Sequence, residues 1–140
     1  MGTAVIIVDT NVVVYFLIRG EFTREAETVR SKDDQWFVPP LFRHEFLNVL
    51  CTYFRKGELQ RDDALRTYRR GMSLITQLTE DHDPRRVFRL VEESGCSSYD
   101  AEFVAVAIEE NVQLVTADAK ILAAFPGVAA NLDEFTRSAN

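Results

Sequence analysis

The segment VIIVDTNVVVYF, residues 5–16, constrains the fold most, because it sets three polar side chains inside an apolar run. Its short β-branched beginning predicts a buried strand of parallel type over residues 4–8, and a helix is expected from residue 11 or 12. Asp9 therefore follows the strand directly, at the end where open parallel sheets bind ligands. Asp, Thr and Asn also cap helices well, so this position alone leaves a purely structural role open.

Short apolar segments alternate with helical patterns along the rest of the chain. Further strands are expected over residues 36–38, 112–116 and 127–132, and further helices over residues 22–30, 41–55, 61–78, 84–95, 98–110 and 119–125. This alternation predicts an α/β fold: an open, mainly parallel sheet of four to five strands with helices on both faces, a Rossmann-like three-layer sandwich. No linker or repeat divides the 140 residues, so one domain over residues 1–140 is expected.

The charge of the chain limits the partners that it can have. The net charge of −6 argues against a protein that coats nucleic acid through bulk charge. Most of its 16 basic residues are nevertheless Arg, whose planar guanidinium binds phosphate well. Arg66, Arg69 and Arg70 cluster on one expected helix and are candidate phosphate-binding residues. A solvated helix face with i,i+4 ion pairs stays open as the alternative.

Nothing in the sequence points to a membrane or to an oxidising compartment. No apolar run approaches the roughly 20 residues that a membrane helix needs, and the N-terminus lacks the pattern of a signal peptide. Cys51 and Cys96 belong to no CxxC pair, which indicates free thiols in a reducing compartment. We therefore expect a soluble cytoplasmic protein.

Three further carboxylates are expected at the same edge of the sheet as Asp9. Asp118 follows the strand over residues 112–116 and precedes a helix, as Asp9 does. Asp100 falls among the apolar positions of its helix when residues are placed about 100° apart, whereas Glu102 points outward. Glu45 borders the apolar face of the helix over residues 41–55. Each residue taken alone also has a structural explanation. It could cap a helix, interact with the helix dipole or be solvated at the surface.

Together, the four acidic residues indicate a cation site. Two unit charges about 4 Å apart repel each other by on the order of 4 kcal/mol at an effective dielectric constant near 20. A divalent cation is the natural compensation, because Mg²⁺ and Mn²⁺ prefer oxygen ligands and usually retain waters. Such an ion can activate water and stabilise phosphoryl oxygens. The sequence therefore predicts a Mg²⁺ or Mn²⁺ site at this edge of the sheet.

The order and spacing of these segments resemble one known family. VIIVDTNVVVYFL, HEFLNVL, SSYDAEFVAVAIEENVQLVTAD and TADAKIL resemble the PIN-domain nucleases, and among them the VapC-type ribonuclease toxins of toxin–antitoxin pairs. The resemblance covers nearly the whole chain. It implies an endoribonuclease that uses Mg²⁺ or Mn²⁺ to hydrolyse RNA phosphodiester bonds. It further implies a homodimer and a cognate antitoxin protein that blocks the site.

The resemblance also implies roles for the four acidic residues. They match the quartet that holds the metal in this family and are the expected catalytic residues. Asp9, Asp100 and Asp118 are the expected metal ligands. Glu45 completes the site, or holds a second ion or the attacking water.

Other residues are expected to support this site. Thr116 matches the Ser or Thr that accompanies the last acid of the family, and Asn11 matches a polar residue beside the first. Arginines from the helices after Glu45, with Arg66, Arg69 and Arg70 as the RNA-binding candidates, are expected to contact flanking phosphates.

Other functions stay open at this point. The family contains RNA-processing nucleases outside toxin pairs, and members without activity that act as binding modules. Receiver domains and haloacid-dehalogenase-type phosphatases also place an Asp after the first strand. Neither accounts for Asp100, and a dehalogenase-type site needs a second Asp where Asn11 stands.

Overall fold

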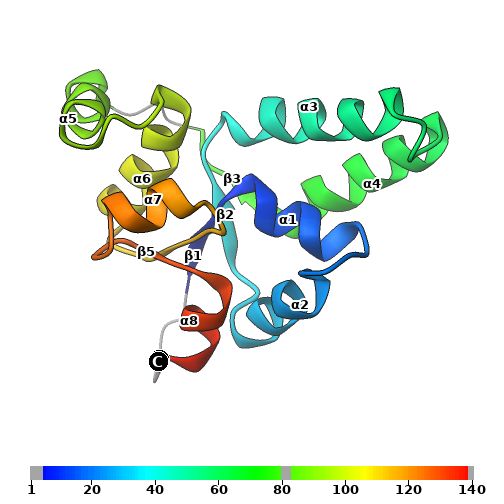
Figure 1. Ribbon diagram of the computed structural model, residues 1–140, viewed down its shortest axis with the longest axis horizontal. Coiled ribbons are helices and arrows are strands. Elements are labelled where there is room, and N and C mark those ends of the chain that lie inside the picture. Colours follow the sequence, from blue (N-terminus) through cyan, green and yellow to red (C-terminus); the bar gives the residue numbers. More distant parts are fainter. Residues whose placement is uncertain (1–4, 80–82, 139–140) are drawn as a thin grey trace.

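The computed structural model describes residues 5–79 and 83–138, which form a five-stranded sheet flanked by helices (Figure 1). The elements follow the chain in the order β1 (Ile6–Val8), α1 (Thr10–Leu17), α2 (Thr23–Lys32), β2 (Trp36–Val38), α3 (Phe42–Arg55), α4 (Arg61–Leu74), β3 (Ile75–Gln77), α5 (Pro84–Ser94), α6 (Ser98–Glu110), β4 (Leu114–Val115), α7 (Ala119–Ala124), β5 (Ala129–Ala130) and α8 (Leu132–Arg137). The predicted α/β fold is confirmed. The first expected strand began at Ala4, which lies outside the described residues.

The sheet is open and parallel throughout. Its strands lie in the order β3-β2-β1-β4-β5, and every neighbouring pair is parallel. From β1 the chain proceeds to β2 and β3 on one side, and then crosses to β4 on the other side. The strand order therefore reverses between β1 and β4, and in open parallel sheets such a reversal places a ligand crevice at the carboxyl ends.

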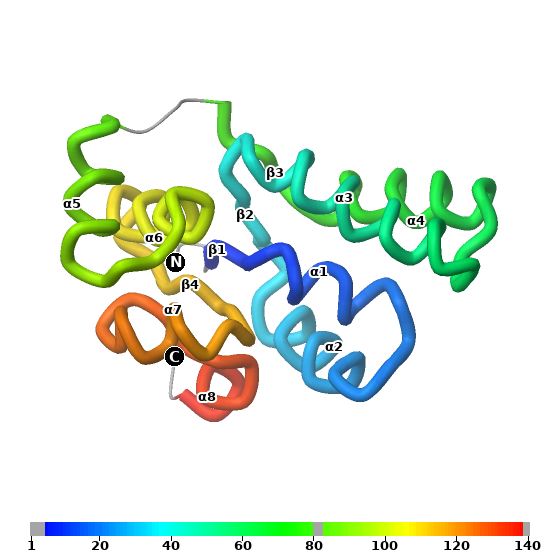
Figure 2. The backbone as a smooth tube through the Cα atoms, turned by 45° about the horizontal axis from the view of Figure 1, so that its top comes forward, coloured from blue at the N-terminus to red at the C-terminus, as the bar shows by residue number. Residues whose placement is uncertain are grey.

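Helices cover both faces of this sheet. Helices α1 to α4 lie on one side and α5 to α7 on the other (Figure 1), as right-handed crossovers require. Helix α8 packs against α2. The tube in Figure 2 shows α3 and α4 as a long antiparallel hairpin that extends away from the strands. In this hairpin Phe46 of α3 stacks on Tyr68 of α4, with ring centroids 6.0 Å apart.

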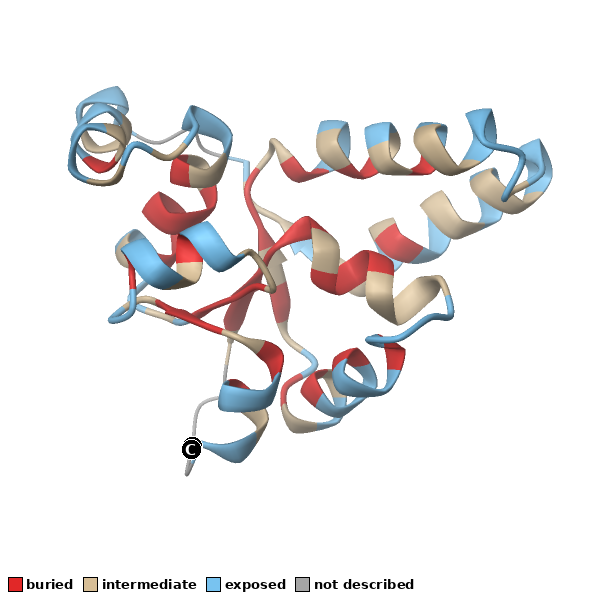
Figure 3. Cartoon of the chain, viewed as in Figure 1, coloured by how far each residue is buried: buried red, intermediate tan, exposed pale blue. Residues whose placement is uncertain are grey.

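The core lies along the central strands. Ile7, Val8, Leu114 and Val115 are fully buried, because strands covered on both faces have no solvated side. Figure 3 shows the buried residues on the strands and on the inner sides of the helices. Within the two described ranges, no helix is long and apolar enough to cross a bilayer.

Most bounds differ from the sequence prediction by a few residues, and in two segments the kind of element differs. The helix expected over residues 61–78 ends at Leu74, and Ile75–Gln77 forms β3, which pairs with β2. Near the C-terminus, the strand expected over residues 127–132 shortens to β5, and α8 begins at Leu132. Asn131 and Glu134 form a capping box there, in which each side chain accepts from the other residue's backbone N–H.

Candidate active site

Asp9 and Thr116 lie side by side because their strands are neighbours. Val8 of β1 pairs with Val115 of β4, so the next residue of each strand leaves the sheet at the same point. Asp9 is 9% exposed and Thr116 is fully buried. The Thr116 hydroxyl donates to Asp9 Oδ2 over 2.6 Å. This contact joins residues that are far apart in the sequence at the carboxyl edge of the sheet.

The polar segment after β1 is held by a short network. The Thr10 backbone N–H donates to Asp9 Oδ1 over 2.8 Å, which makes Asp9 the N-cap of α1. The Asn11 side-chain amide lies 3.5 Å from Asp9 Oδ2 and also accepts from the backbone N–H of Ala117. Asn11 thus bridges the two strand ends.

Asp118 is the N-cap of α7 and contacts the same network. Its Oδ1 accepts from the backbone N–H of Ile121 over 3.0 Å, and its own backbone N–H donates to the Thr116 hydroxyl over 3.0 Å. Among residues 5–79 and 83–138, no side chain or backbone group hydrogen-bonds the other oxygen of its carboxyl group. Like Asp9, it combines a capping contact with a position at the strand ends.

Glu45 and Asp100 approach this edge from two helices on opposite sides of the sheet. Glu45 of α3 accepts a hydrogen bond from the Thr10 hydroxyl over 2.8 Å. Asp100 lies in the first turn of α6, where its backbone N–H donates to the cap residue Ser97. All four carboxylates, with Thr10 and Asn11 among their neighbours, line one open hollow of ≈ 340 Å³, which we call the acidic hollow.

The electrostatics of the acidic hollow favour neutralisation. Burial raises the pKa of Asp9 to about 6, and the charges of Glu45 and Asp100 add to the rise. Hydrogen bonds from Thr116 and Thr10 act in the opposite direction and lower the pKa. Burial and then the charge of Asp100 raise the pKa of Glu45, although the Thr10 hydroxyl lowers it. Burial and then Asp118 raise the pKa of Asp100. A cation in the hollow would offset these penalties.

The donor set fits a hard divalent cation that keeps part of its water shell. The four acidic groups are all oxygen donors, as Mg²⁺ and Mn²⁺ prefer. Among the described residues, no group of three or more His, Cys, Asp or Glu side chains is placed to hold a metal ion by direct contacts alone. Mg²⁺ usually binds one or two carboxylates directly and retains several waters. The residues therefore fit an ion with few direct protein ligands and further contacts through water.

The sequence analysis missed other side chains that line the acidic hollow. Thr10 was considered only as part of a helix cap, yet its hydroxyl holds Glu45. Tyr15, Asn48 and Val49 also line the hollow. The helical spacing of three and four residues from Glu45 places Asn48 and Val49 on the same face of α3 and could have identified them.

The arginines expected to bind phosphate lie elsewhere. Arg66, Arg69 and Arg70 are exposed on α4, and none of them lines the acidic hollow. Arg66 is paired with Asp63 of the same helix. Glu102, expected to point outward, is half-buried and also stays outside the hollow.

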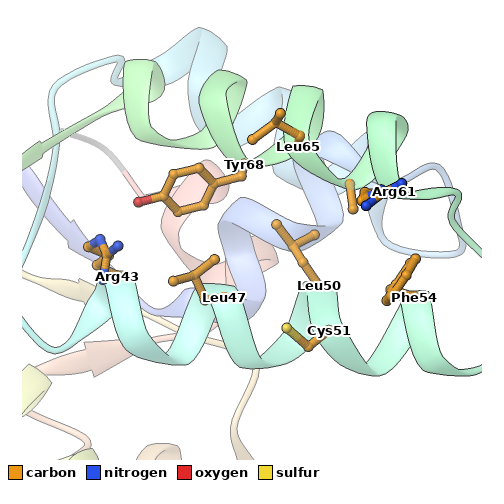
Figure 4. A pocket seen from close by; sticks show the side chains of 9 residues that line it. Arg43, Leu47, Leu50, Cys51, Phe54, Arg61, Leu65 and Tyr68 are labelled. Carbon is orange, nitrogen blue, oxygen red and sulfur yellow. The ribbon is translucent and has the colours of Figure 1, made fainter.

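A separate apolar groove lies between α3 and α4. It encloses ≈ 290 Å³. Leu47 and Leu50 of α3 face Leu65 and Tyr68 of α4 across it, and Phe54 lies near one end (Figure 4). Phe54 and Leu65 are 48% and 44% exposed. We call this surface the hairpin groove.

The fold and the site define the class of protein: a parallel α/β protein with a carboxylate cluster at its topological switch point. The PIN domain model matches residues 6–126, a span that contains all four acidic residues. The chain therefore belongs to the PIN domain family, as the sequence analysis predicted.

Known relatives agree with this assignment. Ribonuclease VapC3 of Pyrobaculum aerophilum is 25% identical over 133 residues, which cover 88% of this chain and 96% of the relative. The crystal structure of PAE2754 from Pyrobaculum aerophilum superposes with a TM-score of 0.77 at 22% identity, over 96% of each chain. A toxin–antitoxin complex from Klebsiella pneumoniae gives a TM-score of 0.67 at 23% identity, over 90% of this chain and 96% of that one.

A third structure shares the same fold. VapBC2 from Rickettsia felis, bound to a DNA fragment from its promoter, gives a TM-score of 0.64 at 15% identity, over 91% of this chain and 98% of that one.

Proposed function

We propose that this chain is a Mg²⁺- or Mn²⁺-dependent endoribonuclease and the toxin of a type II toxin–antitoxin pair. The observation that carries the proposal is the meeting of four carboxylates from four separate elements in one hollow. Membership of the PIN domain family and similarity to a protein named a VapC ribonuclease support it. A purely structural role does not explain why four carboxylates of like charge are brought together, partly buried, at the carboxyl edge of the sheet.

Asp9, Asp100 and Asp118 would hold the cation, directly or through water. A bound divalent ion supplies a water of lowered pKa and neutralises charge on the phosphoryl oxygens. The hydroxyl of Thr10 orients Glu45, and burial raises the pKa of this carboxyl, which makes it a stronger proton acceptor.

Glu45 takes the proton of the attacking water as the water oxygen bonds to phosphorus. The bond from phosphorus to the 3′ oxygen then breaks, and solvent protonates that oxygen. The products are a 5′-phosphate and a 3′-hydroxyl. Network contacts from Thr116 and Asn11 keep the Asp9 carboxyl in place.

The direct test is incubation of the purified protein with total RNA and Mg²⁺, followed by mapping of the cut ends. We expect new 5′-phosphate ends that vanish when EDTA replaces the metal. RNA left intact at every Mg²⁺ and Mn²⁺ concentration would favour the alternative of an inactive PIN fold that acts only as a binding module. Cleavage by a protein whose neighbouring gene encodes no partner would favour an RNA-processing nuclease.

We further propose that the hairpin groove receives the cognate antitoxin, in keeping with the toxin–antitoxin complex among the similar structures. The groove wall is almost wholly apolar, and Arg43 and Arg61 lie toward its two ends (Figure 4). This chemistry fits a segment with an apolar face and acidic flanking residues. We also expect the chain to form a homodimer.

Leu65→Glu tests the groove, because it places a charge on the exposed part of the apolar wall. We expect at least about a 100-fold loss of affinity for the product of the neighbouring gene, the scale of an interface hot spot. The measurement is titration of the purified partners. Phe88→Ala is the control, because Phe88 is 74% exposed but lies on α5, outside the groove. Equal loss in both variants would contradict the assignment.

A further inference from the structure

A second hollow continues the acidic hollow along α1. It encloses ≈ 440 Å³ and is lined by the end of α1, the start of α2 and the turn between α3 and α4. Val14 and Tyr15 line both hollows, so the two share a wall. Ile18, which also lines the second hollow, lies about 12 Å along the helix axis from Thr10. A nucleotide that flanks a phosphate in the acidic hollow can therefore reach this second hollow.

Two aromatic rings form part of its wall. Tyr15 and Phe22 pack with ring centroids 5.0 Å apart and ring planes tilted by 37°. Phe22 nevertheless remains 42% exposed. Exposed aromatic faces beside a nucleic-acid path stack nucleobases, and their removal weakens binding roughly 5- to 150-fold per base.

The charged residues of the second hollow suit a base better than a phosphate. Glu21 and Glu58 both line it and are exposed. Among the described residues, neither takes part in an ion pair. Carboxylates repel phosphate but accept hydrogen bonds from the amino groups of bases. Arg19, whose side chain is 82% exposed, lies in the same wall and can contact the adjoining phosphate.

The Tyr15 phenol connects the two hollows electrostatically. Burial raises its pKa first, and the charge of Asp9 and then of Tyr53 and Glu21 raise it further. The phenol is therefore close to carboxylates of both hollows and stays protonated at neutral pH. Its hydroxyl adds a hydrogen-bond donor beside the carboxylates of Glu21 and Glu58.

We propose that this second hollow is a nucleobase subsite, in which Tyr15 and Phe22 stack a base beside the cleaved phosphodiester while Glu21 and Glu58 accept hydrogen bonds from its exocyclic amino group. The inference rests on the proposed ribonuclease function and adds a base preference to it. Cytosine, adenine and guanine carry an exocyclic amino group, and uracil carries none. The subsite therefore selects against uracil next to the cut.

The test uses the full-length protein and short RNA oligonucleotides that share one cleavage site. The base on each side of the site is changed in turn from cytosine to uracil, which exchanges the amino group for a carbonyl oxygen. At one of the two positions we expect the wild-type kcat/KM to be about 5- to 10-fold higher with cytosine, the lower part of the range for a single base contact. Glu58→Gln, alone and combined with Glu21→Gln, should bring this ratio toward one.

Phe22→Leu tests the stacking wall separately. It keeps an apolar side chain but removes the ring, so KM should rise roughly 5- to 150-fold for both oligonucleotides, with kcat little changed. Phe88→Leu is the matched control, because Phe88 is 74% exposed and lines neither hollow. Thermal melting checks each variant for folding. If Phe22→Leu fails to fold, the Glu58→Gln comparison decides, because Glu58 is exposed in a turn.

The outcomes separate this inference from the proposed function. Efficient wild-type cleavage with no preference at either flanking base would overturn the subsite and leave the ribonuclease proposal standing. The same holds if Phe22→Leu weakens binding of a protein partner but leaves KM for RNA unchanged, because the hollow is then a protein-docking surface. Failure of the wild type to cleave any RNA would overturn the proposed function, and the subsite with it.

Discussion

Asp9 caps α1 and lines the acidic hollow at the same time. One of its oxygens accepts from the Thr10 backbone, and the other accepts from the Thr116 hydroxyl. Asp118 combines a cap and a site position in the same way. A carboxylate oxygen has two lone pairs, so a capping bond leaves room for a further ligand. The structural and the functional interpretations of these residues are therefore compatible.

Asp100 separates site from scaffold, because burial and the charge of Asp118 raise the pKa of its carboxyl more than the Ser97 hydrogen bond and the Lys120 charge lower it. Asp100→Asn removes a charge that burial and Asp118 disfavour, as the raised pKa of this carboxyl indicates. We expect RNA cleavage to fall at least about 100-fold, since even outer contacts of a metal site are worth 10- to 100-fold. The Tm of the metal-free protein should stay equal or rise.

Glu110→Gln serves as the control for this change. Glu110 is exposed at the other end of the same helix and lies outside the acidic hollow, so cleavage should be kept. Cleavage assays and thermal melting in EDTA provide the two readouts. A marked drop in Tm for Asp100→Asn would indicate a structural hydrogen-bond acceptor instead.

Substitution of Thr10 tests whether cleavage requires the hydrogen bond that orients Glu45. Thr10→Val keeps the β-branched shape of a buried side chain but removes the hydroxyl that donates to Glu45. Hydrogen bonds to charged groups contribute about 1.5–3 kcal/mol, so we expect kcat to fall roughly 10- to 100-fold. Thr10→Ser should restore most of the rate, because it returns the hydroxyl. Equal rates in all three proteins would show that Glu45 needs no such contact.

Among the elements, the α3–α4 hairpin depends on a close approach at Gly71. Gly71 is buried in α4, and a methyl group there would overlap the ring of Phe46, which is fully buried. Gly71→Ala should therefore lower the free energy of unfolding by about 1–3 kcal/mol through overpacking, even though Ala favours helices by about 1 kcal/mol.

Urea titration of Gly71→Ala and the wild type measures the difference. Ser73→Ala is the control, since Ser73 is exposed two residues further along α4, and exposed substitutions usually change stability by less than about 0.5 kcal/mol. A stabilised Gly71→Ala protein would mean that Phe46 moves aside without strain.

The sequence predicts a helix or strand correctly where its capping residues and periodicity agree with the tertiary contacts of the segment. Asp83 caps α5 with Pro84 at its first position, as expected. The strand β3 was missed because the helical pattern of α4 runs into it, and only pairing with β2 sets Ile75–Gln77 apart. For α8 a local signal existed, the capping box of Asn131 and Glu134, but the short helix carries little periodicity.

The site was predictable to a similar extent. The positions of Asp9 and Asp118 follow from the rule that parallel strands end at one edge, which needs no tertiary detail. Thr10 and the second hollow depend on how α1 packs beside α3, and a single sequence does not contain that geometry. The arginines of α4 were misplaced for the same reason. Their clustering along one helix is visible in the sequence, but the sequence does not show that this face of the helix lies outside the acidic hollow.

At the scale of the whole molecule, an acidic hollow in a chain of net charge −6 couples stability to pH and to metal. Burial, more than any other cause, raises the pKa of Asp9 from 3.8 to about 6, and Glu45 and Asp100 shift in the same direction. Between these pH values the Asp9 carboxyl is protonated to a greater extent in the folded protein than in the unfolded chain. Stability therefore decreases as pH rises through this range.

The full difference for Asp9 corresponds to about 3 kcal/mol. Because pH 4 already lies just above the unfolded-state pKa, we expect the unfolding free energy in EDTA to fall by about 2 kcal/mol between pH 4 and pH 7.5. Mg²⁺ should restore stability at pH 7.5, where Asp9 is charged, and have less effect at pH 4, where a proton occupies Asp9. Urea titrations at matched ionic strength measure both effects, and Asp9→Asn should flatten the pH dependence. A stability that rises toward pH 7.5 and ignores Mg²⁺ would mean that the four carboxylates are compensated by the protein itself, which would remove the physical reason for a metal in this hollow.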